Sequence, residues 1–422
     1  MEASNHSDVI VLGGGPAGTT AATLLQRKGR AVTLFEREKH PRFHIGESLL
    51  PKNLPILEEL GVLDEIHHIG VYKPGADFTV PGHDDDIKNY AFSRALGDSP
   101  PHAYQIRRAD FDKVLFDNCR NSGVDAREEH CVTRVELAPS GRMHRIFVRD
   151  PAGEESVWTC NYLIDASGRD TLLASQEKWK HRNPRHASAA MFTHFKGATR
   201  RSGTQTGNIS IYWFDGGWVW MIPLPDDVMS VGTVCSAEYF KQRTSSPDEY
   251  FIETLKRCTG AWERVENAEQ LMPVQATGNY SYLSRQNTGD GFALIGDAFA
   301  FIDPVFSSGV YLAMSSAQGI VDVAERWLDE DEPGYRQAVK RYAGRVDRGV
   351  GTFAWFIYRF TTPGMVLLFQ NSRNTWRLEE AVISMLAGDV YSNWRIRWRL
   401  VMFKMMYGIA RVIAPSRQKS AS

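Results

Sequence analysis

The fold of this chain is decided by its opening stretch, Asp8-Val9-Ile10-Val11-Leu12-Gly13-Gly14-Gly15-Pro16-Ala17-Gly18. An apolar run typical of a strand leads into spaced glycines, a helical stretch over residues 19–28 follows, and a second apolar strand over residues 31–35 ends at Glu36. This order predicts a βαβ unit in which Gly13, Gly15 and Gly18 let backbone N–H groups approach a pyrophosphate, while Glu36 accepts from a ribose hydroxyl. The alternative is a glycine-rich turn without a ligand, and the motif alone does not choose between FAD and a nicotinamide cofactor.

A later motif, Ala293-Leu294-Ile295-Gly296-Asp297-Ala298, favours FAD. A strand that ends at Gly296-Asp297 can place a carboxylate on a ribityl hydroxyl, and a helix that starts near Ser308 can direct its positive N-terminus at a flavin ring. No second G-x-G-x-x-G is visible for a nicotinamide cofactor. The two motifs therefore bracket one long flavin cofactor.

Length and composition predict a globular chain of two or three domains. Its 422 residues exceed what one hydrophobic core usually serves, and its 43% hydrophobic and 23% charged residues are average for folded proteins. The net charge of -1 gives no field that would attract nucleic acid. Five cysteines without a C-x-x-C pair predict neither a disulfide framework nor a metal site. The polar start and the lack of a long apolar run predict a cytoplasmic protein without a signal peptide or membrane span.

Further elements are predicted along the chain by periodicity and turn residues. We expect helices over residues 51–60, 108–121 and 308–328, strands over 131–165 and 292–295, and a separate sheet over 188–275. The surroundings of Lys73 and the Gly/Pro/Asp-rich segment 81–101 have the composition of loops. The remainder, to Ile413, is mainly helical.

Two segments, Arg108-Ala109-Asp110-Phe111-Asp112 and Asp165-Ala166-Ser167-Gly168-Arg169, stand in the same order as in flavoproteins of the p-hydroxybenzoate hydroxylase fold, which this chain resembles. Taken alone, the first is typical of an exposed helix and the second of a strand-end turn. The resemblance implies an α/β fold, with a Rossmann-like FAD-binding domain, an inserted mixed-sheet substrate domain and a helical C-terminal region. The expected boundaries are 1–75, 102–185 and 276–330 for the FAD-binding domain, 76–101 and 186–275 for the substrate domain, and 331–422 for the helical region.

Within that fold the chain resembles flavin-dependent halogenases over nearly its whole length, to about Leu328. Its segment Trp218-Val219-Trp220-Met221-Ile222-Pro223 matches the family's W-x-W-x-I-P, and Phe301-Ile302-Asp303-Pro304-Val305-Phe306-Ser307-Ser308-Gly309 matches F-x-x-P-x-x-S-x-G. The segment His40-Pro41-Arg42-Phe43-His44-Ile45-Gly46-Glu47-Ser48-Leu49-Leu50-Pro51 resembles the strap that crosses the flavin in halogenases acting on phenols. Judged by periodicity alone, the two tryptophans of the first motif could equally be core residues of a sheet.

The resemblance implies that reduced FAD, O2 and chloride or bromide generate hypohalous acid, which reaches a lysine facing an aromatic substrate. That lysine is Lys73, in Tyr72-Lys73-Pro74-Gly75, and without the family it would be taken for a solvated loop residue. A desolvated amine suits the role because it can form a haloamine or hold the acid by a hydrogen bond. The reduced flavin, FADH2, is implied to come from a separate flavin reductase.

Other residues receive roles from the same resemblance. The backbone N–H groups of Ser308 and Gly309 would bind halide at a helix N-terminus. Trp218 and Trp220 would keep the substrate away from the flavin, within a tunnel whose motifs also contain Pro223, Phe301, Pro304 and Ser307. No metal is implied, and the residues implied to bind FAD are Gly13, Gly15, Ala17, Gly18, Glu36, Arg42, Gly46, Ser48, Arg108, Asp297, Pro304, Gly309 and Val310.

One position departs from the tryptophan-specific members of the family. These carry a Glu immediately before S-x-G that assists proton loss from an indole, and this chain has Phe306 there. The departure favours a phenol or a pyrrole as the substrate, because its ring is activated by its own heteroatom and has less need of a base. Asp77 and His83, which lie near Lys73 in the sequence, are the candidates for accepting the ring proton, but both are expected to be loop residues. The rival functions are an aromatic hydroxylase, a geranylgeranyl-reductase-like flavin oxidoreductase, and a flavin-bearing docking or membrane-bound protein.

The end of the chain carries an uneven charge. From Tyr391 onward it has seven Lys/Arg and no Asp or Glu, so this part carries +7 and the remaining residues -8. A basic, aromatic and Met-rich helix suits a membrane interface or an acidic partner, such as the carrier protein of an acyl-carrier-protein-bound substrate. The alternative is a C-terminal helix that closes the substrate cavity and whose arginines are solvated.

Overall fold

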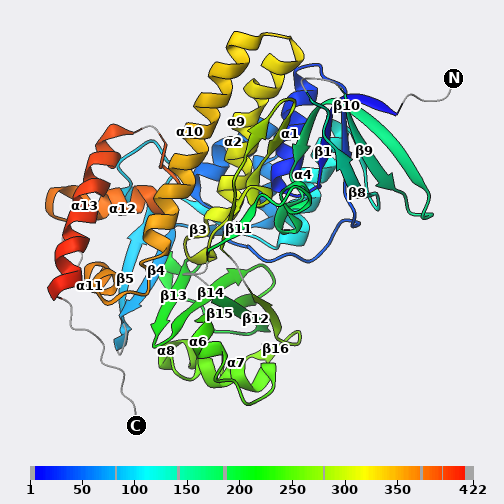
Figure 1. Cartoon of the computed structure of the whole chain (residues 1–422). Helices are drawn as coiled ribbons and strands as arrows, with labels where there is room; N and C mark the ends of the chain where they lie inside the picture. Colours follow the sequence, from blue (N-terminus) through cyan, green and yellow to red (C-terminus); the bar gives the residue numbers. More distant parts are fainter. Residues whose placement is uncertain are drawn as a thin grey trace.

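The computed structural model describes residues 5–80, 83–139, 143–183, 188–278, 281–370, 374–391 and 393–413. Within these ranges two large sheets and a group of C-terminal helices make up the molecule (Figure 1). Every motif singled out in the sequence lies within the described ranges, apart from the side chain of His83 and the last residues of the basic tail.

The first sheet forms the dinucleotide-binding core. Its central strands run parallel in the order β20 (Phe292–Leu294), β10 (Glu155–Asp165), β1 (His6–Leu12), β2 (Val32–Phe35) and β7 (Asp125–Arg127). Three further strands pair antiparallel: β19 (Thr288–Gly289) with β20, β9 (His144–Arg149) with β10, and β8 (Cys131–Glu136) with β9. The apolar run of β1 is buried, as parallel strands covered by helices require. The helix α1 (Pro16–Arg27) packs between α4 (Arg108–Asn121) and α9 (Ser308–Leu328).

The second sheet is mixed and has two different faces. Its order is β16 (Glu269–Gln270), β12 (Ser188–Lys196), β15 (Val228–Ser236), β14 (Gly217–Leu224), β13 (Ile209–Phe214), β4 (Gly75–Val80) and β5 (His83–Ala91), with β17 (Gln275–Gly278) also on β12. Only the β13–β4 pair in this sheet is parallel among the described strands. Because side chains alternate along a strand, Trp218 and Trp220 face the main core, whereas Val219 and Met221 face a smaller one under α6 (Ala237–Phe240), α7 (Pro247–Leu255) and α8 (Thr259–Trp262).

Shorter elements join the two large sheets. The strands β3 (Val71–Lys73) and β6 (Ala103–Gln105) form one small sheet, and β11 (Lys180–Arg182), β18 (Tyr282–Ser284) and β21 (Ala300–Phe301) form another. The remaining short helices are η1 (Pro51–Asn53), α2 (Leu54–Leu60), α3 (Leu63–Ile69), η2 (Phe92–Arg94), η4 (Gly168–Asp170), α5 (Leu172–Gln176), η5 (Gly203–Gln205), η6 (Gly296–Ala298) and η7 (Pro304–Phe306).

The C-terminal helices form a layer beside β4 and β5 (Figure 1). They are α10 (Glu332–Ile357), α11 (Pro363–Gln370), η8 (Thr375–Arg377), α12 (Leu378–Leu386) and α13 (Trp394–Ile413). The last helix, α13, packs on α11 and α12, which in turn contact β4 and η2. None of the described helices combines the length and the apolarity that crossing a membrane requires.

The predicted fold class is confirmed, and two helices have the predicted limits, 108–121 and 308–328. Two loop predictions are wrong. Lys73 ends a strand, β3, and most of the segment 81–101 forms the strand β5 and the turn η2. The reason is that polar residues of this hairpin are paired inside the sheet: Asp77 accepts from Asn89 at 2.7 Å and from Asn208 at 3.0 Å and is fully buried. Asp77 is therefore a buried strand residue and not the loop residue that was predicted.

Candidate active site

The glycine turn brings the start of α1 close to β1 and β2. Gly13 has a φ of +101°, and a Cβ on Gly18 would lie 1.9 Å from the carbonyl oxygen of Gly13, so both positions require glycine. Glu36, at the end of β2, accepts from the backbone N–H of Gly14 at 2.7 Å. No side chain caps the N-terminus of α1, and its first turn carries no acidic residue. Its free N–H groups are therefore available to an anion.

One long cavity of about 590 Å³ extends from this turn to the second sheet, a volume suited to a cofactor-sized ligand. Its wall combines residues that are far apart in the sequence, in particular the glycine turn, the strap, the start of α9 and three strands of the second sheet. The predicted site residues that line it are Gly13, Gly15, Ala17, Glu36, Arg42, Gly46, Ser48, Arg108, Trp218, Trp220, Asp297, Phe301, Pro304, Ser307, Gly309 and Val310. Gly18, Lys73, Pro223 and Ser308 were also predicted as site residues but do not line this cavity.

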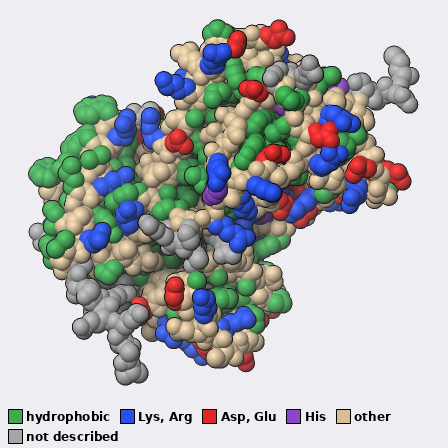
Figure 2. All heavy atoms as spheres, viewed as in Figure 1, with side chains coloured by type: hydrophobic (Ala, Val, Ile, Leu, Met, Phe, Trp, Pro, Cys, Tyr) green, Lys and Arg blue, Asp and Glu red, His purple; other side chains and the backbone are tan. Residues whose placement is uncertain are grey.

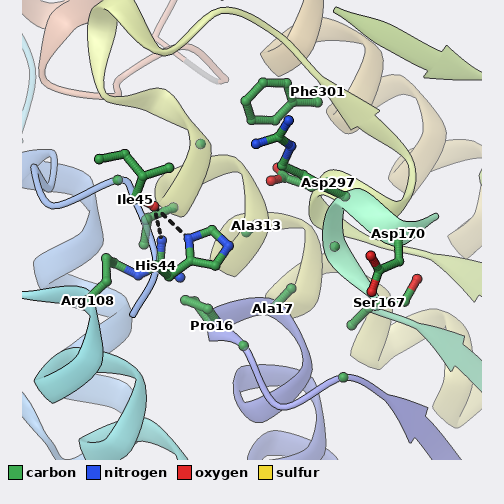
Figure 3. A pocket seen from close by; sticks show the side chains of 18 of the residues that line it. Pro16, Ala17, His44, Ile45, Arg108, Ser167, Asp170, Asp297, Phe301 and Ala313 are labelled. Atoms are coloured by element: carbon green, nitrogen blue, oxygen red, sulfur yellow. Dashed lines mark hydrogen bonds between the residues drawn. The ribbon is translucent and has the colours of Figure 1, made fainter. Parts of the chain in front are cut away.

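The strap is held by a buried group of charges. Arg108 donates two hydrogen bonds to Asp112, at 2.8 and 3.0 Å, and a third to the carbonyl oxygen of Ile45, at 3.0 Å. Arg42 donates to the same carboxylate at 3.0 Å. Figure 3 shows Arg108 and His44 converging on Ile45, across the cavity from Asp297. The charge of Arg108, together with burial, lowers the pKa of His44 to about 4, so this ring stays neutral at physiological pH.

The opposite side of the cavity is formed by Asp297 and the loop that leads into α9. Burial raises the pKa of Asp297 to about 6, but its carboxylate is still mainly ionised at pH 7 and can accept a hydrogen bond from a ligand hydroxyl. Asp303 caps the loop by accepting from Val305 N at 3.2 Å, and Ser307 stands in the left-handed region at φ +57° before the helix starts. The hydroxyl of Ser308 is buried and has no hydrogen-bond partner among the described residues.

These residues fit FAD. Gly15 and Ala17 line the cavity at one helix N-terminus and Gly309 and Val310 line it at another, so each end of a long cavity meets backbone N–H groups and a positive helix dipole. The carboxylate of Asp297, which feels the charges of Arg108 and Arg169, lies between the two ends. A pyrophosphate at the first end, hydroxyls near Asp297 and a flavin ring at the second end would satisfy this donor and acceptor set.

The tryptophans of β14 form the wall nearest the second sheet. Trp220 donates from Nε1 to Ser230 Oγ at 3.2 Å. Its ring packs so closely on Gly232 that a Cβ at this position would lie 2.2 Å from the ring carbon Cζ2. Trp218 and Trp220 are tilted against each other with centroids 5.8 Å apart. Their rings are thus fixed between the cavity and the main core.

Lys73 lies behind the cavity wall and is 1% exposed. Its amine donates to Ser48 Oγ at 2.8 Å and to the carbonyl oxygen of Leu49 at 2.9 Å, and it lies 5.3 Å from the ring centre of Phe92. Burial lowers the pKa of Lys73 to about 7. Because Ser48 itself lines the cavity, one hydroxyl group connects Lys73 to the cavity.

Phe306 belongs to an aromatic cluster between the second sheet and the C-terminal helices. Phe360 lies at its centre, with ring centroids 4.7 Å from Trp213, 5.3 Å from Phe306 and 6.4 Å from Trp218. Phe369, on α11, packs against Phe360 at 5.9 Å. The sequence showed no periodic signal that would join these residues, since they come from five separate segments of the chain.

Two other functional candidates were missed at the level of sequence. Glu47, on the strap, lines the cavity, is 1% exposed and lies 2.9 Å from His194 of β12. Asp112, which binds both Arg42 of the strap and Arg108, follows Arg108 by four residues on a helix, a spacing at which opposite charges meet. That spacing was visible in the sequence, whereas the Glu47–His194 contact depends on tertiary structure.

Replacing Asp297 with alanine should weaken FAD binding about tenfold, because the variant loses one hydrogen bond to a charged acceptor, worth about 1.5 kcal/mol. Titration of the apoprotein with oxidised FAD, followed by quenching of flavin fluorescence, measures the change. Asp290→Ala is the matched control, since Asp290 is exposed beside the same sheet. Equal affinities for the two variants would contradict the assignment of Asp297.

Comparisons with known proteins show the family of this chain. The family model described as tryptophan halogenase matches residues 8–96 and 87–363. A 1H-pyrrole-2-carbonyl-(peptidyl-carrier protein) chlorinase from Pseudomonas fluorescens is 29% identical over 97% of this chain and 94% of its own length. A tryptophan 2-halogenase from Chondromyces crocatus is 35% identical over 75% of this chain, which spans 60% of that relative.

Two solved structures share the fold over nearly the whole chain. A flavoprotein/dehydrogenase from Cytophaga hutchinsonii superposes with a TM-score of 0.88 at 28% identity, covering 96% of this chain and 99% of the other. The flavin-dependent brominase Bmp2 superposes with a TM-score of 0.83 at 25% identity, covering 95% and 99%. With the family model matching most of this chain, and with a cavity that fits FAD, this chain belongs to the family of flavin-dependent halogenases.

Proposed function

We propose that this protein halogenates an electron-rich aromatic ring, phenolic or pyrrolic, and that Lys73 carries the halogen to it. The observation that carries the proposal is the environment of Lys73, a fully buried amine with a pKa of about 7 that donates to Ser48 in the wall of the flavin cavity. Near neutral pH about half of this amine is unprotonated, so its lone pair is available to an electrophile.

Bound reduced FAD, with O2 and a halide ion, supplies the electrophilic halogen as hypohalous acid. Lys73 can take the halogen on Nζ, releasing water, and then pass it to a ring carbon, whose proton the amine receives. Ser48 and the carbonyl of Leu49 hold Nζ in place through its two hydrogen bonds. Trp218 and Trp220 fill the wall between the cavity and the aromatic cluster, which keeps the ring away from the flavin.

Ser308 and Gly309 are proposed to hold the halide ion. They begin α9, a helix of 21 residues, so their backbone N–H groups have no partner within the helix and lie at its positive end. The buried, unpartnered hydroxyl of Ser308 offers a third donor. Chloride and bromide both suit such a site, because each accepts several N–H and O–H donors.

The aromatic cluster around Phe360 is proposed as the region that the substrate ring enters. It joins β4 and β13 of the second sheet to α11 and to the end of α10, in agreement with a substrate domain over 76–101 and 186–275 closed by the helical region 331–422. The first sheet supports an FAD-binding domain over 1–75, 102–185 and 276–330. Phe306 provides no carboxylate there, so the ring must lose its proton without the base of the tryptophan-specific enzymes.

The substrate is proposed to be an aromatic acyl group bound to an acyl carrier protein. The pyrrole chlorinase from Pseudomonas fluorescens is named for a peptidyl-carrier-bound pyrrole, and this chain aligns with 94% of its length. A separate flavin reductase is proposed to deliver FADH2, since the sequence contains a single G-x-G-x-x-G motif. A tryptophan substrate is less well supported because of Phe306, although a tryptophan 2-halogenase is among the relatives.

Mass spectrometry tests the function directly. The protein is incubated with FAD, a flavin reductase, NADH and either chloride or bromide, and is offered pyrrole-2-carboxylate as a carrier-bound thioester and as a pantetheine thioester, with phloroglucinol as a phenol. We expect products whose mass and isotope pattern change with the halide supplied. A hydroxylated product that forms equally without halide would instead assign the protein to the aromatic hydroxylases.

A further inference from the structure

The helix α13 has an exposed surface that the proposed chemistry does not use. Among its described residues are the cations Arg395, Arg397, Arg399, Lys404 and Arg411, and it contains no acidic residue. No ion pair joins any of these five cations to a carboxylate in the described part of the chain. Their positive charge is therefore not neutralised within the described structure.

An apolar stripe runs between these cations along the whole helix. Its members recur at spacings of three and four residues on the outward face: Trp394, Trp398, Val401, Met405, Ile409 and Val412, with exposed fractions of 68%, 37%, 51%, 66%, 61% and 85%. The inward face, with Ile396, Leu400, Phe403 and Tyr407, packs on the protein. Figure 2 shows hydrophobic and basic side chains intermixed on this side of the molecule. Such a continuous exposed apolar patch marks an interaction surface.

A groove lies beside the stripe, between α13 and the end of α10. Its wall contains Trp355 and Arg359 of the α10 side and Lys404, Tyr407 and Arg411 of α13. Arg359 lies 4.7 Å and Lys404 5.0 Å from the ring centre of Trp355. Burial and the neighbouring charge of Arg359 lower the pKa of Lys404. Arg359, Lys404 and Arg411 thus share one groove whose described lining includes no carboxylate. This arrangement favours the binding of an anionic group.

The groove is close to the proposed substrate region. Arg359, which lines the groove, directly precedes Phe360, the centre of the aromatic cluster. Phe356, one turn earlier on α10, packs against Phe403 of α13 with ring centroids 5.3 Å apart. The groove and the cluster are therefore neighbours along the end of α10.

We propose that α13 and this groove dock an acidic acyl carrier protein, with carboxylates of the carrier pairing with the cations and its apolar helix face covering the stripe. This inference rests on the carrier-bound substrate of the proposed function. Charge complementarity selects an acidic partner over a second copy of the chain, because two α13 helices would bring ten cations together. A membrane is less favoured, since Arg359, Lys404 and Arg411 line a groove, whereas a membrane interface meets the exposed face of a helix.

The experiment compares two forms of one acyl group. The probes are pyrrole-2-carboxylate on a purified, phosphopantetheinylated acyl carrier protein and the pantetheine thioester of the same acid. The test variant is R395E/R397E/R411E, which reverses three charges on exposed residues of α13. We expect the KM for the carrier-bound substrate to rise about 10- to 100-fold, and the kcat/KM for the pantetheine thioester to stay within about twofold of wild type.

Two further variants make the result specific. R149E/K241E/K340E reverses three exposed charges elsewhere and should leave both KM values unchanged. V401E/M405E interrupts the stripe without altering the groove and should also raise only the carrier KM. Circular dichroism verifies that each variant is folded.

Three outcomes would overturn the docking surface. A carrier KM unchanged in both α13 variants would exclude it, while turnover of the pantetheine thioester would still support the proposed function. Binding to vesicles of phosphatidylglycerol that is lost in R395E/R397E/R411E, without carrier binding by the wild type, would assign the surface to a membrane. A dimer in light scattering that V401E/M405E dissociates would assign it to a second copy of the chain. If the wild type halogenates neither thioester nor phloroglucinol, the proposed function itself fails.

Discussion

Replacing Lys73 with methionine should abolish halogenation and make the folded protein more stable. The first effect follows from the proposed role, because methionine keeps the length and volume of the side chain but has no amine to carry the halogen. We expect product formation to fall at least about 100-fold, in keeping with the loss of a nucleophilic group. FAD affinity should stay within about twofold, since Lys73 does not line the cavity.

The second effect follows from the pKa of Lys73, which burial lowers from 10.5 to about 7. Between these two values the unfolded chain binds a proton that the folded chain does not, so burial of this amine opposes folding at pH 7. Methionine removes that penalty but leaves Ser48 and the carbonyl of Leu49 without a donor. The net gain should be on the order of 1–3 kcal/mol, or a rise in Tm of about 2–5 °C at pH 7.

The sign of the pH dependence gives an independent check. Because the folded pKa is depressed, wild-type stability should rise between pH 7 and pH 10, and the advantage of Lys73→Met should shrink over that range. Wild-type halogenation should increase as pH passes through 7, since the neutral amine is the active form. Differential scanning fluorimetry and mass spectrometry measure the two effects, with the exposed Lys28→Met as control. More than about a tenth of wild-type halogenation in Lys73→Met would refute the proposed role.

Sequence reasoning predicted those parts of the fold that depend on local pattern. The strand before the glycine turn and the helix 308–328 follow from apolar periodicity. The turn itself follows from backbone conformations that only glycine adopts readily. The strand β5 was missed because its polar residues lie in a hairpin whose partners, Asn208 among them, come from distant parts of the chain. Composition indicates a loop at such a segment, and only tertiary pairing makes it a strand.

The candidate site divides in the same way. Most predicted cavity residues belong to contiguous motifs. Glu47, although it lies in the strap motif, was not predicted because its contact with His194 joins separate elements, and Phe360 was missed for the same reason. Burial of Lys73 could not be inferred from sequence either, because an isolated lysine between Tyr72 and Pro74 has the pattern of an exposed turn. The family resemblance identified this lysine, and the structure adds its low pKa and its contact with Ser48.

Replacing Asp112 with alanine should destabilise the protein by about 3–5 kcal/mol, because it would leave two arginines without their buried partner. Asp112 is fully buried on α4 and accepts three hydrogen bonds from Arg108 and Arg42. Burial alone would raise its pKa, but the charges of the two arginines outweigh burial and lower it. The stability it contributes is thus present above pH 4 and is lost as pH falls further.

The same substitution should also release the strap, since Arg108 holds the carbonyl of Ile45 only while Asp112 orients its guanidinium. Urea unfolding measures stability, and FAD titration of the folded fraction should show affinity reduced at least about tenfold. Asp112→Asn, which keeps part of the hydrogen bonding, should be intermediate and remains measurable if the alanine variant does not fold.

Asp117→Ala is the matched control for this prediction. Asp117 pairs with Lys113 on the same helix, at the same spacing of four residues and at 2.6 Å, but both side chains are more than 40% exposed. Solvent screens such a pair, so its loss should cost less than about 0.5 kcal/mol. Similar losses of stability in Asp112→Ala and Asp117→Ala would show that burial does not set the strength of the strap anchor. A large difference, with FAD affinity lowered only in Asp112→Ala, would show that the strap depends on a charge buried beneath it.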